Sequence, residues 1–502
     1  MKREKELYQK VRQSSFYMII GKLVTPIIGF LISIYIIRKL SVTEYGIYNM
    51  LLAVMGYIGL FSSLGLPSIF QRYIPEFNEE KKVSNLKKLI TQGSLLRVVL
   101  SALFVLFVIL FSNQVGRFFK IEDWTGYFKI FSLGIIFSLE SSLLSIALTS
   151  LFLHKYFVIS NTLYVVLRAG ILYFLLKLGF GLNGLIIGEA ICYGILMIMF
   201  ILFYNFRFAK LNKVNGKERF PLKRLARYGG YSYFNEVGTT ILSVSTDFFV
   251  ISAYLGPSAV GIYAFANKLM QMLTRWMPHN LVREVIKPTF FTRYTQTKNI
   301  NDLEKMFNLL SKFSIFFIFP LITGIFILGD KIILFIFGAK YISSLQIVWI
   351  VAFFAAIQSF TFSVGLVIRA IEKIHVVLLS KMFAIYNLIG DVLVVKHWGI
   401  TGIALITSSA VLFRSFFVFY FARRYTGLSF DLKGVLVISL NSVILGLFFY
   451  FARPFIVNTQ SLIVSAILGI VIYLLISHFN KAFTEQERKI INRVLPKPYF
   501  VF

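Results

Sequence analysis

Eight basic residues lie inside long apolar stretches of this chain, where a positive charge is costly. They are Lys22, Arg97, Lys129, Arg168, Lys268, Arg275, Lys381 and Arg414. On insertion scales each costs roughly 2.5–3.5 kcal/mol at the centre of a membrane helix, unless it faces protein or water. Lys129 is close enough to a helix end to reach the headgroups, whereas Arg168 and Arg275 lie near the middle of their stretches and should face inward or be paired. For the other five, both explanations stay open.

Polar side chains accompany these basic residues in three of the stretches. Between 229 and 254 they recur every three or four positions and form one helical stripe: Ser232, Asn235, Glu236, Thr239, Thr240, Ser243, Thr246 and Asp247. The stretch 261–283 carries Asn267, Lys268, Gln271, Thr274, Arg275 and Pro278, and 15–37 carries Lys22, Thr25, Pro26, Gly29 and Ser33. Interhelical hydrogen bonds would explain one stripe. Three stripes fit better as the walls of a shared aqueous cavity.

This cavity is expected to be cationic and to bind an anionic group such as a diphosphate. Its predicted binding residues are Lys22, Lys268 and Arg275, with Arg168 and Arg414 as second candidates. Its predicted polar wall is Asn235, Thr239, Ser243, Asn267 and Gln271. The carboxylates of the apolar stretches are Glu140, Glu189, Glu236, Asp247 and, near a stretch end, Asp391. Each of them could neutralise a neighbouring cation, or bind a coupling proton or sodium ion, a role for which Asp247 and Glu236 are favoured.

Several kinds of chemistry have no motif in the sequence. There is no Gly-x-x-x-x-Gly-Lys-Ser/Thr phosphate loop and no His-Glu-x-x-His or Cys-x-x-Cys pattern, and Cys192 is the single cysteine. We therefore expect no enzyme, no cofactor and no metal. The net charge of +30 lies in short tracts between apolar segments, which favours anionic lipid headgroups over nucleic acid as partners.

The elements that position these residues are predicted to be fourteen transmembrane helices. With 57% hydrophobic residues, the chain has more apolar surface than one soluble core can bury. Runs of about 20 apolar residues span a bilayer as helices. The predicted spans are 15–37, 45–68, 89–112, 127–151, 156–177, 183–205, 229–254, 261–283, 309–329, 342–368, 374–395, 399–422, 432–452 and 461–480. The predicted fold class is an all-α polytopic membrane protein.

The basic residues outside the spans predict the orientation. Of the 52 lysines and arginines, 35 lie at the two termini and in or beside every second gap, against nine in the opposite gaps. By the positive-inside rule, both termini are cytoplasmic and the number of spans is even.

An internal repeat predicts two lobes. Leu40-Ser41-Val42-Thr43-Glu44-Tyr45-Gly46-Ile47-Tyr48 is echoed 215 residues later by Leu255-Gly256-Pro257-Ser258-Ala259-Val260-Gly261-Ile262-Tyr263. Spans 1 and 2 then correspond to spans 7 and 8, and the two six-helix lobes are related by an axis along the membrane normal. The expected parts are an N-terminal lobe at 1–205, a basic cytoplasmic linker at 206–228, a C-terminal lobe at 229–422, spans 13 and 14 at 423–480, and a cytoplasmic tail at 481–502 with a short amphipathic helix near 485–494.

The segment from Ile37-Arg38-Lys39 through Tyr48, followed by Leu64-Gly65-Leu66 and Arg72-Tyr73-Ile74, resembles the polysaccharide-transporter branch of the multidrug/oligosaccharidyl-lipid/polysaccharide exporter superfamily. That branch includes the Wzx-like flippases. The resemblance implies a prokaryotic plasma-membrane protein that moves an undecaprenyl-diphosphate-linked oligosaccharide to the outer leaflet by alternating access, through a cationic cleft. The expected partners are this substrate and membrane lipids, and other polysaccharide-assembly proteins are candidates.

Three other functions compete with this one. A cation-coupled drug or metabolite antiporter of the same superfamily would need a cavity dominated by carboxylates. The apolar stretches of this chain instead contain eight basic residues and five acidic ones. A membrane glycan polymerase usually needs a sizeable external loop, and no external gap exceeds about 20 residues. A non-transporting scaffold would have no use for buried polar stripes.

Overall fold

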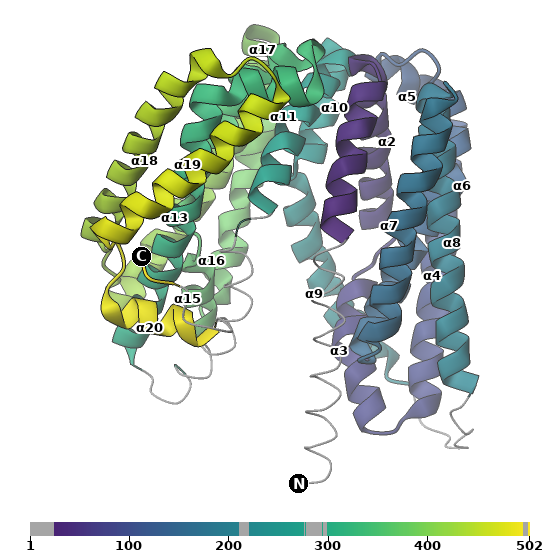
Figure 1. Ribbon diagram of the computed structural model, residues 1–502. Coiled ribbons are helices and arrows are strands. Elements are labelled where there is room, and N and C mark those ends of the chain that lie inside the picture. The colour runs from purple at the N-terminus through teal and green to yellow at the C-terminus, as the bar shows by residue number, and fades with distance from the viewer. Residues whose placement is uncertain (1–24, 210–219, 276, 278–293, 295–298, 495–499) are drawn as a thin grey trace. The chain divides into compact units, whose positions relative to one another are not determined.

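The structure, a computed structural model, describes residues 25–209, 220–275, 277, 294, 299–494 and 500–502. Over these ranges it is almost entirely helical and contains no strand, so the predicted all-α class is confirmed (Figure 1). The chain divides into two compact units, Met1–Gly261 and Ile262–Phe502. This division lies inside α11 (Pro257–Arg275), beyond the linker expected at 206–228, because α9 and α10 pack against α2 and α3.

Within the described residues, the first unit contains helical residues 25–39 and then nine further helices before α11. These are α2 (Val42–Phe61), α3 (Leu66–Glu79), α4 (Val83–Leu110), α5 (Ser112–Phe119), α6 (Trp124–Ser150), α7 (His154–Lys177), α8 (Gly181–Ala209), α9 (Leu222–Ile241) and α10 (Val244–Leu255). Helix α6 packs on α4 and α8, and α8 packs on α7. Half of the apolar window of α6 is buried, against 17% for α7, so α6 is the central helix and α7 lies at the surface of this unit.

Two of the predicted spans are bent. The segment expected at 45–68 turns by 54° between α2 and α3, where Leu64 and Gly65 adopt left-handed φ values of 43° and 74°. The segment expected at 229–254 turns by 50° between α9 and α10. A break at membrane depth leaves backbone carbonyls without helical partners, and these must be satisfied within the protein. Polar side chains near both breaks meet this need, as described for the candidate site.

The repeated motif marks a close crossing of α2 and α11. Ser41 and Glu44 form a capping box that starts α2, with hydrogen bonds of 3.1 and 2.8 Å. A Cβ at Gly46 would lie 1.8 Å from the carbonyl oxygen of Pro257, and a Cβ at Gly261 would lie 2.0 Å from that of Val42. These two pairs are equivalent at the 215-residue offset. In each copy of the repeat, the glycine therefore packs against the residue that starts the helix of the other copy.

The second unit contains the rest of α11 and the helices that follow. They are α13 (Ile300–Ile332), α14 (Leu345–Ser359), α15 (Val364–Ala370), α16 (Ile374–Leu379), α17 (Phe383–Thr426), α18 (Leu432–Ala452), α19 (Thr459–Asn480) and α20 (Glu485–Val494). A short π-helix (Ile333–Phe337) and 3₁₀ helices at Ala339–Ser344, Ser380–Met382 and Arg453–Phe455 connect some of them. Helix α13 packs against α14 and α18, and half of its apolar window is buried, which makes it the central helix of this unit.

Helix α17 contains two antiparallel segments. Gly399 leaves the helical conformation with φ 54° and ψ −144°. The hydroxyl oxygens of Tyr386 and Ser409 then lie 3.1 Å apart, and Ile406 packs directly on Gly390. This hairpin matches the boundary expected between 395 and 399. Among the described residues, nine helices are long and apolar enough to cross a bilayer, or up to eleven if each bent pair is one span. The count of fourteen therefore stays a prediction.

The C-terminal helix α20 is tied to the second unit by a buried lysine. Lys312 on α13 is only 1% exposed, and its Nζ lies 2.9 Å from the carboxylate of Glu487 on α20 and also contacts Asp431. Burial by itself would raise the pKa of Asp431, but the hydrogen bonds from Lys312 and from the backbone N–H of Gly434 lower it overall. The helix predicted near 485–494 is present, with Ile491 packed into the protein core.

Candidate functional site

Arg168 forms a buried ion pair in the first unit. Its Nε on α7 donates to both carboxylate oxygens of Glu189 on α8, at 2.9 and 3.0 Å, and Glu189 is fully buried. The Tyr48 hydroxyl on α2 donates to the same carboxylate at 2.8 Å. Such a bidentate, hydrogen-bonded pair is how a charge is tolerated at membrane depth. A substrate diphosphate would have to compete with Glu189 for Arg168, so the structure favours the paired alternative for this residue.

Arg97 on α4 supports the bend between α2 and α3. Its Nη1 donates to the carbonyl oxygen of Gly59 at 2.7 Å, two residues before α2 ends, and the residue is only 6% exposed. A cation is favourable there, because the last carbonyls of a helix carry partial negative charge. The carboxylates of Glu140 on α6 and Glu236 on α9 attract the positive charge of Arg97. The role of Arg97 is thus explained within the first unit.

The polar wall residues of α9 divide into two groups. Asn235 and Thr239 are exposed, and the Thr239 hydroxyl donates to the Asn235 carbonyl at 2.9 Å. The Ser243 hydroxyl donates instead to the carbonyl of Thr240 at 2.6 Å, and that carbonyl also accepts from Thr246 at 3.1 Å. Ser243 therefore serves the break between α9 and α10.

The two carboxylates favoured for ion coupling both lie at helix breaks. Glu236 accepts hydrogen bonds from Ser63 at 2.9 Å and from Ser68 at 3.5 Å, on either side of the α2–α3 bend. Asp247 is completely buried in the first turn of α10, where the helix N-terminus favours a negative charge. One residue earlier, Thr246 lies 2.6 Å from the hydroxyl of Tyr57 on α2. Glu236 is thus bound to the α2–α3 bend, and Asp247 lies directly after the break between α9 and α10.

The polar residues of α11 share one face of that helix. Asn267 and Lys268 are half-buried, and Gln271 and Arg275 are exposed, whereas Phe265 and Leu269 on the opposite side are buried. The Asn267 amide donates to the Tyr263 carbonyl at 3.0 Å. Arg275 is the last residue of α11. Lys22 lies outside the described residues.

Arg414 is brought together with another basic residue. Arg414 on α17 lies near enough to Lys381, in the turn before α17, for the two positive charges to interact. Both side chains are half-buried.

Sequence reasoning does not anticipate the burial of Lys312 or of Asp391, and it does not name the partner of Arg168. Lys312, which the sequence groups with the residues of a basic gap, is buried on α13. Asp391, expected near a helix end, is fully buried, as is Asn387 one turn earlier. The sequence does contain a signal for the partner of Arg168. Arg168 and Glu189 lie about equally far from the turn at Gly179–Gly181, so their side chains lie at a similar depth.

Comparisons with known sequences find a family and a relative. Residues 36–346 match a sequence family described as polysaccharide biosynthesis protein. The probable low-salt glycan biosynthesis flippase Agl15 of Haloferax volcanii is 20% identical over 494 residues, which cover 96% of this chain and 99% of the relative.

Solved structures show the same fold. The lipid II flippase MurJ in an inward closed conformation has a TM-score of 0.67 at 18% identity, over 92% of this chain and 97% of that one. An inward-facing multidrug resistance MATE family transporter of the MOP superfamily has a TM-score of 0.64 at 13% identity, over 82% and 98%. Both likenesses show that the fold is shared. Because the matched family covers more than half of the 502 residues, the chain belongs to the polysaccharide biosynthesis protein family.

Proposed function

We propose that this protein is a flippase that moves an undecaprenyl-diphosphate-linked oligosaccharide from the cytoplasmic to the outer leaflet of a prokaryotic plasma membrane. The observation that carries the proposal is the match to a glycan biosynthesis flippase over nearly the whole of both chains. Basic residues at membrane depth support it, because a diphosphate crossing the bilayer needs positive partners.

Alternating access would move the lobe of spans 1–6 against the lobe of spans 7–12, with both termini in the cytoplasm. The bends between α2 and α3 and between α9 and α10 support this proposal, since a bent helix can change its angle without unfolding. We assign Glu236 and Asp247, which lie at these bends, as candidates for binding the coupling ion.

The diphosphate would be bound by Lys268 and Arg275 on the polar face of α11, with Arg414 beside Lys381 and with Lys22. Arg168 is a weaker candidate because Glu189 already holds it. The exposed side chains of Asn235, Thr239 and Gln271, together with Asn267, would bind sugar hydroxyls, whereas Ser243 is occupied at the helix break.

A cation-coupled drug antiporter is the second candidate, because the fold is shared with a multidrug MATE transporter. Its cargo is positive and calls for carboxylates. The eight basic residues of the apolar stretches, against five acidic ones, disfavour it.

Replacing Arg275 tests the proposed site. We expect Arg275→Ala and Arg275→Glu to abolish export of the glycan to the cell surface while the protein stays at normal abundance. One charged hydrogen bond is worth ~1.5–3 kcal/mol, so its loss weakens binding about 10- to 100-fold. Arg275→Lys should retain part of the activity, and Arg424→Ala, which removes an exposed arginine at the end of α17, should retain all of it. Full export by Arg275→Ala would remove Arg275 from the site.

A further inference from the structure

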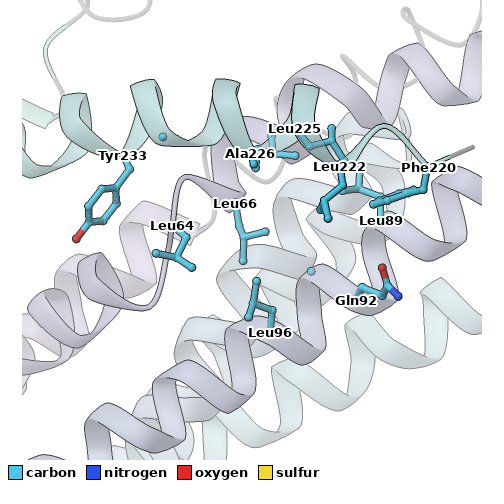
Figure 2. Close-up of a pocket in the computed structure, with 13 residues that line it drawn as sticks. Leu64, Leu66, Leu89, Gln92, Leu96, Phe220, Leu222, Leu225, Ala226 and Tyr233 are labelled. Atoms are coloured by element: carbon cyan, nitrogen blue, oxygen red, sulfur yellow. The ribbon is translucent and has the colours of Figure 1, made fainter.

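An apolar cavity of about 430 Å³ lies within the first unit, between α3, α4 and α9. Its wall is built from Leu66 of α3, Leu89 and Leu96 of α4, and Leu222, Leu225 and Tyr233 of α9, whose side chains Figure 2 shows around one space. Its volume falls in the range of ligand pockets. Leu222 and Leu96 remain 66% and 42% exposed, so the cavity is open on one side.

Three exposed basic residues lie next to residues that line this cavity. The Nζ of Lys88 lies 5.0 Å from the ring centroid of Phe220, which also lines the cavity. Lys223 follows Leu222 directly, and Arg227 comes one turn later; all three basic residues are exposed. Lys88 and Lys223 both lie in the first two turns of their helices, α4 and α9. The nearby Arg224 is instead paired with Glu76 of α3 at 2.7 Å.

We infer that this cavity binds an anionic phospholipid of the surrounding leaflet, with an acyl chain against the leucines and the phosphate between Lys88 and Lys223. The apolar wall suits a hydrocarbon chain, and the basic residues supply the charge complement that a zwitterionic headgroup would use less well. Phospholipid is the occupant because the wall is apolar while the residues beside it are basic, and an acyl chain joined to an anionic headgroup matches both. The bound lipid would join α9 to α4, beside the α2–α3 bend, where Leu64 and Leu66 line the cavity.

Binding can be measured on the full chain purified in detergent, by titrating phosphatidylglycerol or phosphatidylcholine and counting the retained lipids by native mass spectrometry. One basic residue near a membrane surface contributes about 1 kcal/mol, or about fivefold in affinity. We therefore expect the double variant Lys88→Ala/Lys223→Ala to bind phosphatidylglycerol about 25-fold more weakly. Ala226→Phe, which places a ring in the cavity from an exposed position, should abolish the tightest site. Lys433→Ala, at an exposed lysine that starts α18, is the matched control and should bind as wild type does.

The inference is supported if phosphatidylglycerol binds more tightly than phosphatidylcholine and if both cavity variants, but not the control, lose that preference. Equal affinities of the wild type and the two cavity variants would overturn it. The inference would also be overturned if farnesyl phosphate bound more tightly than phosphatidylglycerol and displaced it, because the cavity would then be a site for a prenyl lipid. Circular dichroism of each variant shows whether lost binding reflects lost folding.

Discussion

Arg168→Ala should lower the free energy of unfolding of the protein by about 3–5 kcal/mol. The substitution leaves Glu189, which is fully buried, without the guanidinium that donates to both of its oxygens. An uncompensated carboxylate at membrane depth must be protonated or draw in water, and either change weakens the packing of α7 on α8. The measurement is denaturant or thermal unfolding of the purified protein, together with its abundance in the membrane.

Two further variants separate the buried charge from the loss of an arginine. Arg168→Met/Glu189→Met removes both charges and should recover most of the lost stability, because a buried ion pair can often be replaced by apolar residues. Arg224→Ala breaks an exposed arginine–glutamate pair with Glu76 and should change stability little. If Arg168→Ala were as stable as wild type, the pair would not neutralise a buried charge as the structure indicates.

Gly46→Ala and Gly261→Ala should each destabilise the crossing of α2 and α11. The added methyl carbons would lie 1.8 Å from the oxygen of Pro257 and 2.0 Å from that of Val42, so the two backbones must separate. Overpacking of this kind costs roughly 1–3 kcal/mol. Both substitutions separate the same pair of helices, so the double variant should be less destabilised than the sum of the single variants. Unfolding of the three purified proteins measures this coupling.

Gly56→Ala is the matched control for the crossing. Gly56 lies on the same helix α2 and is exposed, and a methyl carbon added there would have no heavy atom within 4 Å outside its own stretch of helix. Alanine is favoured over glycine in a helix interior by about 1 kcal/mol, so this variant should be as stable as wild type or slightly more stable. Equal stability of Gly46→Ala and Gly56→Ala would mean that α2 and α11 do not approach closely.

The positions of the helices could be predicted from the sequence, because apolar runs that match the bilayer thickness must satisfy their own backbone. The bends could not. Leu64 adopts a left-handed φ of 43°, which a leucine in the sequence does not predict. The turn after Leu242 is stabilised by hydroxyl groups, and the same hydroxyl groups could equally have lined a cavity. Only the packing of neighbouring helices shows whether a hydroxyl group stabilises a helix break or lines a cavity.

For the charged residues, too, the sequence predicts one part of the structure and not the other. That some basic residues lie at membrane depth follows from the sequence, but their partners depend on tertiary contacts. Lys312 finds Asp431 and Glu487, which are 119 and 175 residues away along the chain, and no local pattern connects them. Arg414 and Lys381 approach because the chain reverses at Gly399 between them.

Leaflet exchange in proteoliposomes tests the central claim most directly. The purified protein is reconstituted with an undecaprenyl-diphosphate oligosaccharide, and the fraction of glycan that a membrane-impermeant glycosidase can reach is followed over time. We expect wild type to expose the glycan of the protected leaflet, and Arg275→Ala to stay at the rate of protein-free vesicles. Exchange no faster than in protein-free vesicles, together with transport of a cationic drug by the same preparation, would contradict the assignment as a flippase.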